Sequence, residues 1–264
     1  MKETSRLIDY GLNEKVALIT GVSRRIGIGA AIALELAKAG CNIFTTWYSP
    51  YDSLAFGKDS STDSHEILEA VRAQGVNADG LQADLSNPQV PSLLFDTAEK
   101  VLGPVDILIN NAAYSINADI YTLTAEIMDA HYAVNLRGTV LMCAEFARRH
   151  NGRPGGRIIN LTSGQSVGPM PDEIPYITTK GAIEALTTSL SEMLISKGIT
   201  VNAVDPGVTD TGWMKPDLYA ELVAASPAGR VGAPLDAARI ILYLSSSQAG
   251  WVTGQIVHSR GSVR

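Results

Sequence analysis

The chain has 264 residues, of which 45% are hydrophobic and 18% charged, and its formal net charge is -6. This composition is typical of a folded globular protein and excludes an intrinsically disordered one. The acidic balance argues against a dedicated nucleic-acid-binding protein, which usually carries a basic patch or stripe. The length fits one or two domains.

Neither secretion nor membrane insertion is indicated. Residues 1–13 are mixed polar and charged, so we expect no signal peptide, and no apolar run reaches the roughly 18 residues of a membrane helix. The two cysteines, Cys41 and Cys143, form neither a disulfide framework nor a zinc pattern, and we expect buried thiols in a reducing compartment. We therefore expect a cytoplasmic protein with no membrane or nucleic-acid partner. The four histidines show no metal-ligand spacing, and we expect no metal.

Short apolar runs alternate with longer amphipathic ones along the whole chain, which predicts a parallel sheet covered by helices. Residues 47–61 contain Pro50 and Gly57 and are expected to form a loop. No linker composition divides the chain, so we expect one domain over residues 1–264. Strands are expected near residues 16–20, 42–46, 77–82, 105–110, 157–161, 200–204 and 255–258. Helices are expected near residues 29–39, 63–74, 91–102, 124–149, 176–197, 217–225 and 235–245.

A glycine-rich turn, Thr20–Gly29, joins the first expected strand to the first expected helix. Glycines in this position let the backbone approach a pyrophosphate, and the free N–H groups of the helix start attract the anion. The usual three-glycine fingerprint is incomplete, because Ile32 stands where the third glycine would fall. The turn indicates a dinucleotide site, and a turn that merely packs is the alternative.

Two features of this region bear on the choice of cofactor. The second strand ends without the acidic residue that binds the ribose 2′-hydroxyl in NAD sites, and Asp52 lies further along. Arg24 and Arg25 lie in the glycine turn, where a guanidinium could bind a 2′-phosphate. Both features favour NADP(H), with NAD(H) as the alternative, although the arginines could also be simply solvated.

Tyr176 and Lys180 are four positions apart and fall on one face of an expected helix. A phenol has a reference pKa of about 10, and a nearby ammonium is expected to lower it. Such a tyrosine can give a proton to a carbonyl oxygen or take one from an alcohol. Ser163 follows the fifth strand, where a hydroxyl could bind the reacting oxygen. Taken singly, the pair could be a helix-surface contact and the serine a turn residue.

In combination and in order, these motifs resemble the short-chain dehydrogenase/reductase superfamily, in its single-domain form and its 3-oxoacyl-[acyl-carrier-protein] reductase-like branch. The resemblance extends over about residues 15–261. The motifs that carry it are the Thr20–Gly29 turn, Asp84-Leu85, Asn110-Asn111-Ala112-Ala113, Asn135, Ser163, Tyr176, Lys180, and Pro206-Gly207 with Thr209 and Thr211.

The resemblance implies a fold and a set of site residues. The implied fold is an α/β Rossmann-type doubly wound sheet of about seven parallel strands in the order 3-2-1-4-5-6-7. The implied catalytic tetrad is Tyr176 as acid or base, Lys180 as its partner and ribose ligand, Ser163 on the substrate oxygen, and Asn135 holding a water. The implied cofactor-binding residues are Gly21, Ser23, Arg24, Arg25, Gly27, Ile28, Asp84, Leu85, Asn111, Ala112, Tyr176, Lys180, Pro206, Gly207, Thr209 and Thr211. The implied assembly is a homotetramer or homodimer, and the implied substrate is a small carbonyl compound or alcohol.

The chain departs from the family pattern at the glycine turn and near its C-terminus. Five residues instead of three separate Gly21 from Gly27, as in the enoyl-reductase branch. An enoyl-thioester reductase is therefore an alternative, but that branch places the lysine seven positions after the tyrosine. A non-catalytic nucleotide-binding sensor is a further alternative, although such proteins tend to lose the tyrosine or the lysine. Arg260 replaces a common aspartate, so subunit contacts there are expected to differ.

Overall fold

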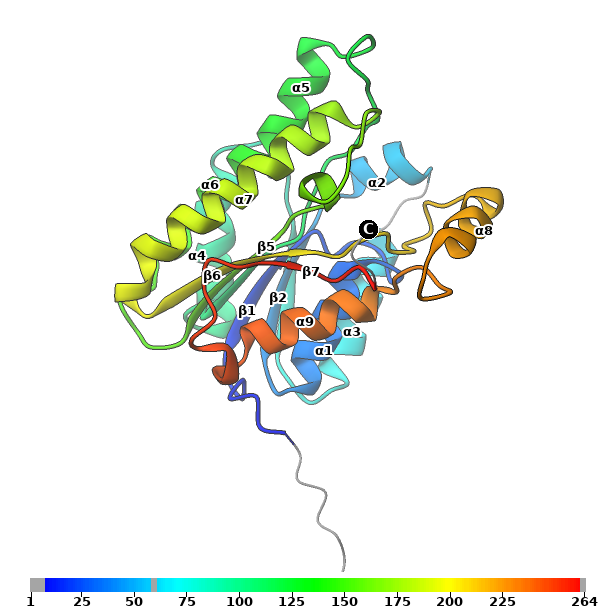
Figure 1. Cartoon of the computed structure of the whole chain (residues 1–264). Helices are drawn as coiled ribbons and strands as arrows, with labels where there is room; N and C mark the ends of the chain where they lie inside the picture. Colours follow the sequence, from blue (N-terminus) through cyan, green and yellow to red (C-terminus); the bar gives the residue numbers. More distant parts are fainter. Residues whose placement is uncertain (1–7, 58–60, 262–264) are drawn as a thin grey trace, which may run out of the picture.

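The computed structural model of the protein describes residues 8–57 and 61–261. At its centre lies a seven-stranded sheet with the order β3-β2-β1-β4-β5-β6-β7, in which every pair of neighbours is parallel (Figure 1). The predicted sheet and strand order are thereby confirmed. The strands are β1 Val16–Thr20, β2 Asn42–Trp47, β3 Ala78–Gln82, β4 Ile107–Asn110, β5 Gly156–Leu161, β6 Ile199–Asp205 and β7 Ile256–His258.

Helices cover both faces of the sheet, as expected for parallel strands joined by crossovers. Helices α1, α3 and α9 lie on one face, and α4, α6 and α7 lie on the other (Figure 1). The helices are α1 Ile28–Lys38, α2 Ser49–Phe56, α3 Ser61–Arg72, α4 Val90–Leu102, α5 Ala125–His131, α6 Thr139–Arg149, α7 Ile174–Leu194, α8 Pro216–Ala225 and α9 Pro234–Ser245.

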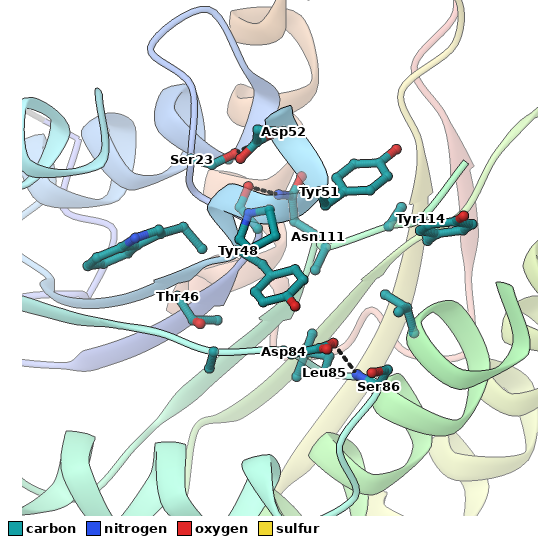
Figure 2. Close-up of a pocket in the computed structure, with 18 of the residues that line it drawn as sticks. Ser23, Thr46, Tyr48, Tyr51, Asp52, Asp84, Leu85, Ser86, Asn111 and Tyr114 are labelled. Atoms are coloured by element: carbon teal, nitrogen blue, oxygen red, sulfur yellow. Dashed lines mark hydrogen bonds between the residues drawn. The ribbon is translucent and has the colours of Figure 1, made fainter. Parts of the chain in front are cut away.

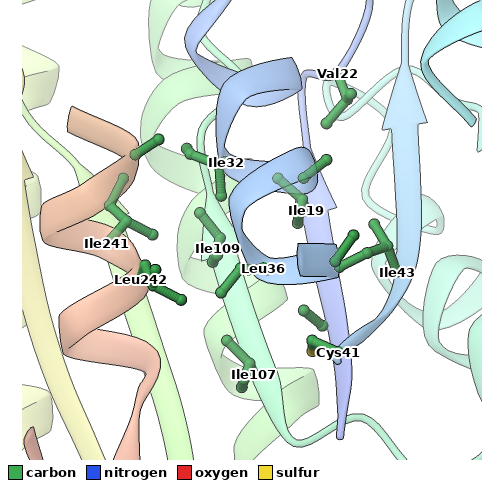
Figure 3. Close-up of a cluster of buried hydrophobic side chains, with 14 of the residues drawn as sticks. Ile19, Val22, Ile32, Leu36, Cys41, Ile43, Ile107, Ile109, Ile241 and Leu242 are labelled. Atoms are coloured by element: carbon green, nitrogen blue, oxygen red, sulfur yellow. The ribbon is translucent and has the colours of Figure 1, made fainter. Parts of the chain in front are cut away.

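Alternate side chains of the strands supply the two halves of the core. Ala17 and Ile19 of β1 face α1 and α9, whereas Val16 and Leu18 face α4 and α6. In Figure 3, Ile241 of α9 lies beside α1 and the strands beneath them. Burial of each large aliphatic side chain contributes about 1.5–3 kcal/mol, so the sheet is anchored from both sides. The carboxyl ends of the strands are therefore held in fixed positions, as a binding site requires.

The predicted loop at residues 47–61 was wrong, because part of it forms helix α2. Pro50 occupies one of the first two positions of this helix, where its missing N–H costs nothing. Gly57 ends the helix in the left-handed conformation with φ +64°, and its N–H donates to the carbonyl of Ser53 at 3.1 Å. The two residues that suggested a loop are thus the boundaries of a short helix.

The predicted helix over residues 124–149 is broken in its middle. Thr124 caps α5 as its position predicted, with its Oγ1 accepting from the N–H of Ile127 at 3.4 Å. Residues Tyr132–Gly138 then form a π-helical segment before α6 begins. Such segments are rare and frequently occur at functional sites. Asn135 lies inside this one.

Some expectations concern single residues rather than elements. Cys41 and Cys143 are both buried free thiols, as predicted. Within residues 8–57 and 61–261, no helix is long and apolar enough to cross a bilayer, and no group of three or more His, Cys, Asp or Glu is arranged to hold a metal ion. Residues 1–7 of the segment expected not to be a signal peptide lie outside the described residues.

Candidate active site

A cavity of about 740 Å³ opens at the carboxyl edge of the sheet. Its walls come from the segments that follow the first four strands, including Gly21 after β1, Tyr48 after β2, Asp84 after β3 and Asn111 after β4 (Figure 2). Ligands of open parallel sheets bind in this position, outside the carboxyl ends of the strands.

The glycine turn is fastened to the end of β4. Thr20 Oγ1 accepts from the backbone N–H groups of Asn111 and Ala112, both at 3.0 Å. Asn111 Nδ2 donates to the carbonyls of Thr20 and Gly21, both at 2.9 Å. A Cβ on Gly21 would lie 2.6 Å from the Cα of Ala112, and its φ of +74° also favours glycine. The close approach of the two strand ends therefore requires glycine at this point.

The two arginines of the turn face different surroundings. The Arg24 guanidinium lies 3.6 Å from the centre of the Phe56 ring, and its Nη1 donates to the carbonyl of Thr211 at 2.7 Å. Arg25 lies outside the cavity wall and pairs with Glu66 at 2.6 Å and Asp63 at 3.5 Å. Arg24 also lies 3.8 Å from a carboxylate oxygen of Asp52, and of the two arginines it is the one on the cavity wall.

Asp84 and Leu85, the predicted adenine contacts, lie on the cavity wall after β3. Figure 2 shows the Tyr48 ring pointing toward Asp84. Burial and the hydrogen bond to Asp84 raise the pKa of the Tyr48 phenol. Tyr48 and Asp84 are thus neighbours on the cavity wall.

The residues of the proposed tetrad meet where β5 gives way to α7. Tyr176 forms a hydrogen bond with Ser163, and the Nζ of Lys180 lies 5.5 Å from the centre of the Tyr176 ring. Lys180 is only 3% exposed, and its Nζ donates to the carbonyl of Leu161 at 2.6 Å. A phenol, a hydroxyl and an ammonium are therefore assembled at one point of the sheet edge.

The pKa of the Tyr176 phenol is shifted in the direction opposite to the one that the sequence predicted. Burial raises the pKa of Tyr176 well above its ordinary value, the negative charge of Glu173 raises it further, and the hydrogen bond with Ser163 opposes them. Burial also lowers the pKa of Lys180 to about 8. The predicted acidification of the phenol was wrong for this structure, because burial and the charge of Glu173 raise the pKa of Tyr176. Tyr176 is consequently protonated near neutral pH.

Asn135 joins the catalytic helix to the strand end. Its Oδ1 accepts from the N–H of Tyr114 at 2.7 Å, and its Nδ2 donates to the carbonyl of Tyr114 at 2.8 Å and to Thr179 Oγ1 at 3.2 Å. The residue is 1% exposed. The π-helical segment brings this side chain to both α7 and the segment after β4.

Comparison with known proteins agrees with this geometry. Residues 21–261 match a family model described as enoyl-(acyl carrier protein) reductase. The structure resembles that of a Serratia marcescens short-chain dehydrogenase/reductase variant, with a TM-score of 0.83 and 30% identity over 94% of this chain and 96% of that one. The chain belongs to the short-chain dehydrogenase/reductase family.

Several other relatives of this dehydrogenase/reductase are reductases or oxidoreductases. An uncharacterized oxidoreductase of Bacillus subtilis, YjdA, is 44% identical over 94% of this chain and 96% of its own. The 3-oxoacyl-[acyl-carrier-protein] reductase FabG of Staphylococcus epidermidis is 32% identical, over 94% of this chain and 98% of its own. The structure of LugOII, described as a promiscuous reductase that catalyses keto-reduction in lugdunomycin biosynthesis, superposes with a TM-score of 0.85 and 31% identity over 96% and 98% of the two chains.

The cavity contains most of the cofactor-binding residues expected of such an enzyme. Those on its wall are Gly21, Ser23, Arg24, Gly27, Ile28, Asp84, Leu85, Asn111, Ala112 and Thr211. Those outside the wall are Arg25, Tyr176, Lys180, Pro206, Gly207 and Thr209.

The lining suits a nicotinamide dinucleotide. Helix α1 begins at Ile28 with no acidic residue in its first turn, which leaves its N-terminus favourable to a pyrophosphate. Gly21 and Gly27 of the turn lie on the cavity wall, where the backbone can approach a phosphate closely. The residues present therefore fit the cofactor that the family uses.

Helix α2 is the part of the dehydrogenase/reductase site that the sequence did not predict. The hydroxyl of Tyr51, on α2, accepts from the N–H of Ser115 at 3.1 Å and donates to the carbonyl of Ser115 at 3.4 Å. Asp52 accepts from Ser23 at 3.0 Å. Pro50 and Gly57, read as helix boundaries, would have revealed a helix here, although not its contacts.

The Pro206-Gly207 turn is held by the C-terminal segment. Asp205, at the end of β6, is 1% exposed and pairs with Arg260 and with His258, each at 2.9 Å. Arg260 is therefore occupied within its own subunit. Through Asp205, Arg260 stabilises the Pro206-Gly207 turn.

Proposed function

We propose that the protein is an NADP(H)-preferring carbonyl reductase that transfers a hydride between nicotinamide and a carbonyl compound or secondary alcohol. The observation that carries the proposal is the assembly of Ser163, Tyr176 and Lys180 beside a cavity lined with dinucleotide-binding groups. Membership of an oxidoreductase family supports it.

The residues have distinct parts in the reaction. Bound nicotinamide supplies the hydride that adds to the carbonyl carbon. The Ser163 hydroxyl holds the carbonyl oxygen as negative charge develops on it. Tyr176 carries its proton at neutral pH and donates it to that oxygen as general acid. Lys180 has three N–H donors, one of which is given to the carbonyl of Leu161, and the others are available to the nicotinamide ribose and Tyr176. Asn135 keeps the Thr179–Lys180 turn in place.

We propose reduction as the physiological direction, because the proposed preference for NADP(H) favours it. In reduction, Tyr176 donates its proton to the carbonyl oxygen, and in the reverse reaction the same group would accept the proton of the alcohol.

The preference for NADPH rests on Arg24. Its guanidinium faces the cavity from the glycine turn, and no acid lies directly at the end of β2 where NAD sites commonly place one. A relative in Arabidopsis thaliana, 35% identical, carries the name NADPH-dependent aldehyde reductase-like protein. NAD(H) is the alternative cofactor.

A 3-oxoacyl thioester is the substrate class that the FabG relatives suggest. An enoyl thioester is the second candidate, supported by the description of the matching family model and by the lengthened glycine turn. The spacing of four between Tyr176 and Lys180 favours the first.

NADPH consumption, followed with acetoacetyl thioester, crotonyl thioester and a panel of ketones and quinones, tests these proposals together. We expect turnover with keto substrates, slower turnover with NADH, and none with crotonyl thioester. Turnover of the crotonyl thioester alone would identify an enoyl reductase. No turnover with any compound, despite NADPH binding, would support a nucleotide sensor.

The assembly and location are proposals of the same kind. We propose a homotetramer or homodimer of single-domain subunits, with the nucleotide-binding half at about 15–113 and the catalytic half at about 114–264. We also propose that the protein works in the cytoplasm, where its two buried free thiols suit a reducing environment. Light scattering and fractionation test these two statements.

A further inference from the structure

The carboxylate of Glu184, on α7, accepts hydrogen bonds from the loop that carries Ser163. Glu184 lies on α7 four residues beyond Lys180 and eight beyond Tyr176, so all three side chains fall on one face of the helix. Glu184 is half-buried at the junction between α7 and the loop that leaves β5.

A single oxygen of Glu184 accepts three hydrogen bonds. Its Oε1 accepts from Gln165 Nε2 at 2.6 Å, from Thr162 Oγ1 at 3.2 Å and from Ser166 Oγ at 3.2 Å. Hydrogen bonds to an ionised acceptor are roughly twice as strong as neutral ones. The three donors come from both flanks of Ser163 in the sequence, and Ser163 itself makes no contact with Glu184 among the described hydrogen bonds.

Lys180 also contacts this junction, through its backbone carbonyl and through its side chain. Thr162 Oγ1 lies 3.3 Å from the carbonyl of Lys180, and the Nζ of Lys180 reaches the carbonyl of Leu161. Thr162 and Lys180 thus connect the end of β5 with α7. Glu184 adds hydrogen bonds from α7 to the loop that follows β5.

We propose that Glu184 is a positioning residue that fixes Ser163 relative to Tyr176 by holding Thr162, Gln165 and Ser166 against α7. The proposal rests on the proposed function, because it gives Ser163 the task of holding the substrate oxygen. Glu184 does not line the cofactor cavity. Its loss should therefore affect the chemical step and leave cofactor binding intact.

The first test compares Glu184→Ala and Glu184→Gln with Glu192→Ala. Glu192 is an exposed carboxylate further along the same helix and is the matched control. We expect Glu184→Ala to lower kcat about 10- to 100-fold, because a misplacement of about 1 Å at a reacting group has an effect of this size. The dissociation constant for NADPH should change less than about twofold, since the cofactor contacts are untouched. Glu184→Gln keeps an acceptor oxygen and should recover part of kcat.

The second test asks whether Glu184 acts through Ser163. In a Ser163→Ala background, Glu184→Ala should produce almost no further loss, since the group it positions has gone. Fully additive losses in kcat would contradict the proposal, as would wild-type kcat in Glu184→Ala.

A third readout does not depend on turnover. The N–H groups of Val167 and Gly168 donate to the carbonyl of Gly164, so the loop carries amides whose hydrogen exchange can be followed. Exchange in residues 162–168 should accelerate about tenfold or more in Glu184→Ala and stay unchanged in Glu192→Ala. Unchanged exchange in both variants would refute the positioning role. Faster exchange in an enzyme that reduces no carbonyl compound would leave the positioning intact and refute the proposed function.

Discussion

Helices α7 and α8 each follow a strand of the sheet and lie near its carboxyl edge, yet they are built differently. Helix α7 buries Pro175, Thr179, Lys180, Ile183, Thr187, Ser191 and Leu194, whereas no residue of α8 is buried. The helix that carries Tyr176 and Lys180 is therefore packed into the core, with Tyr176 itself half-buried, whereas the side chains of α8 are free to vary without disturbing the core. This difference explains why the reaction can be inferred from the chain, whereas the substrate cannot.

The largest effect should come from the centre of α7. Tyr176→Phe removes the proposed acid and little else, and a general acid contributes about 10²- to 10⁴-fold to the rate. We expect the kcat for carbonyl reduction to fall by at least about 10³-fold, with NADPH affinity nearly unchanged. Steady-state assays with calorimetric titration of NADPH provide the measurement. Retention of more than a tenth of kcat would show that Tyr176 is not the general acid.

The burial of Lys180 should produce a pH dependence. Its pKa is lowered to about 8, so the ammonium is present below that pH and is lost as the pH rises through it. The kcat/KM for reduction should therefore fall above about pH 8, by about tenfold per unit if one proton is required. Lys180→Arg, if active, should keep its rate to higher pH, because arginine stays protonated. A profile that is flat to pH 9.5 in the wild type would contradict this assignment.

Arg24 connects the glycine turn to Thr211, on the approach to α8. Arg24→Ala should weaken NADPH binding about tenfold, because a charge-assisted contact with the 2′-phosphate contributes about 1.5 kcal/mol or more. NADH binding should change less than about threefold, since NADH has no such phosphate. Arg25→Ala is the control, because Arg25 pairs with Asp63 and Glu66 outside the cavity. Equal losses for the two cofactors would argue against a 2′-phosphate contact.

The smallest effect should come from α8. Tyr219 of α8 and Tyr243 of α9 are 42% and 41% exposed, which makes them a matched pair. If α8 helps to bind substrate, Tyr219→Ala should raise the KM for a bulky ketone about threefold or more, with kcat nearly constant, because apolar contact is lost from binding. Tyr243→Ala should leave the KM unchanged. Identical KM values in both variants would show that α8 does not contribute to substrate binding.

The sequence predicted the fold correctly and also indicated the proposed tetrad, because the signals of both are local. Apolar runs of strand length mark β1, β4 and β5, and the glycines after β1 mark the turn that approaches β4. The spacing of Tyr176 and Lys180 already placed both on one helix face. Each of these patterns depends on residues that are close together in the chain.

Helix α2 was missed because a local signal was misinterpreted, whereas the other missed features have no local signal. Helix α2 was read as a loop because Pro50 and Gly57 break a helix in its interior but bound one at its ends. The π-helical segment around Asn135 has no local signal. The pKa of Tyr176 was predicted in the wrong direction, since burial, Glu173 and Tyr51 from α2 decide it and spacing along one helix shows none of them.

The central claim is that a neutral Tyr176 gives its proton to an oxygen beside the nicotinamide ring. A crystal structure with NADP⁺ and a bound alcohol product tests this most directly. We expect the product oxygen within hydrogen-bond reach of both Tyr176 and Ser163, at about 2.6–3.2 Å, with its carbon about 3–3.5 Å from the nicotinamide ring. A nicotinamide ring bound away from Tyr176, or a product oxygen that contacts neither hydroxyl, would contradict the account.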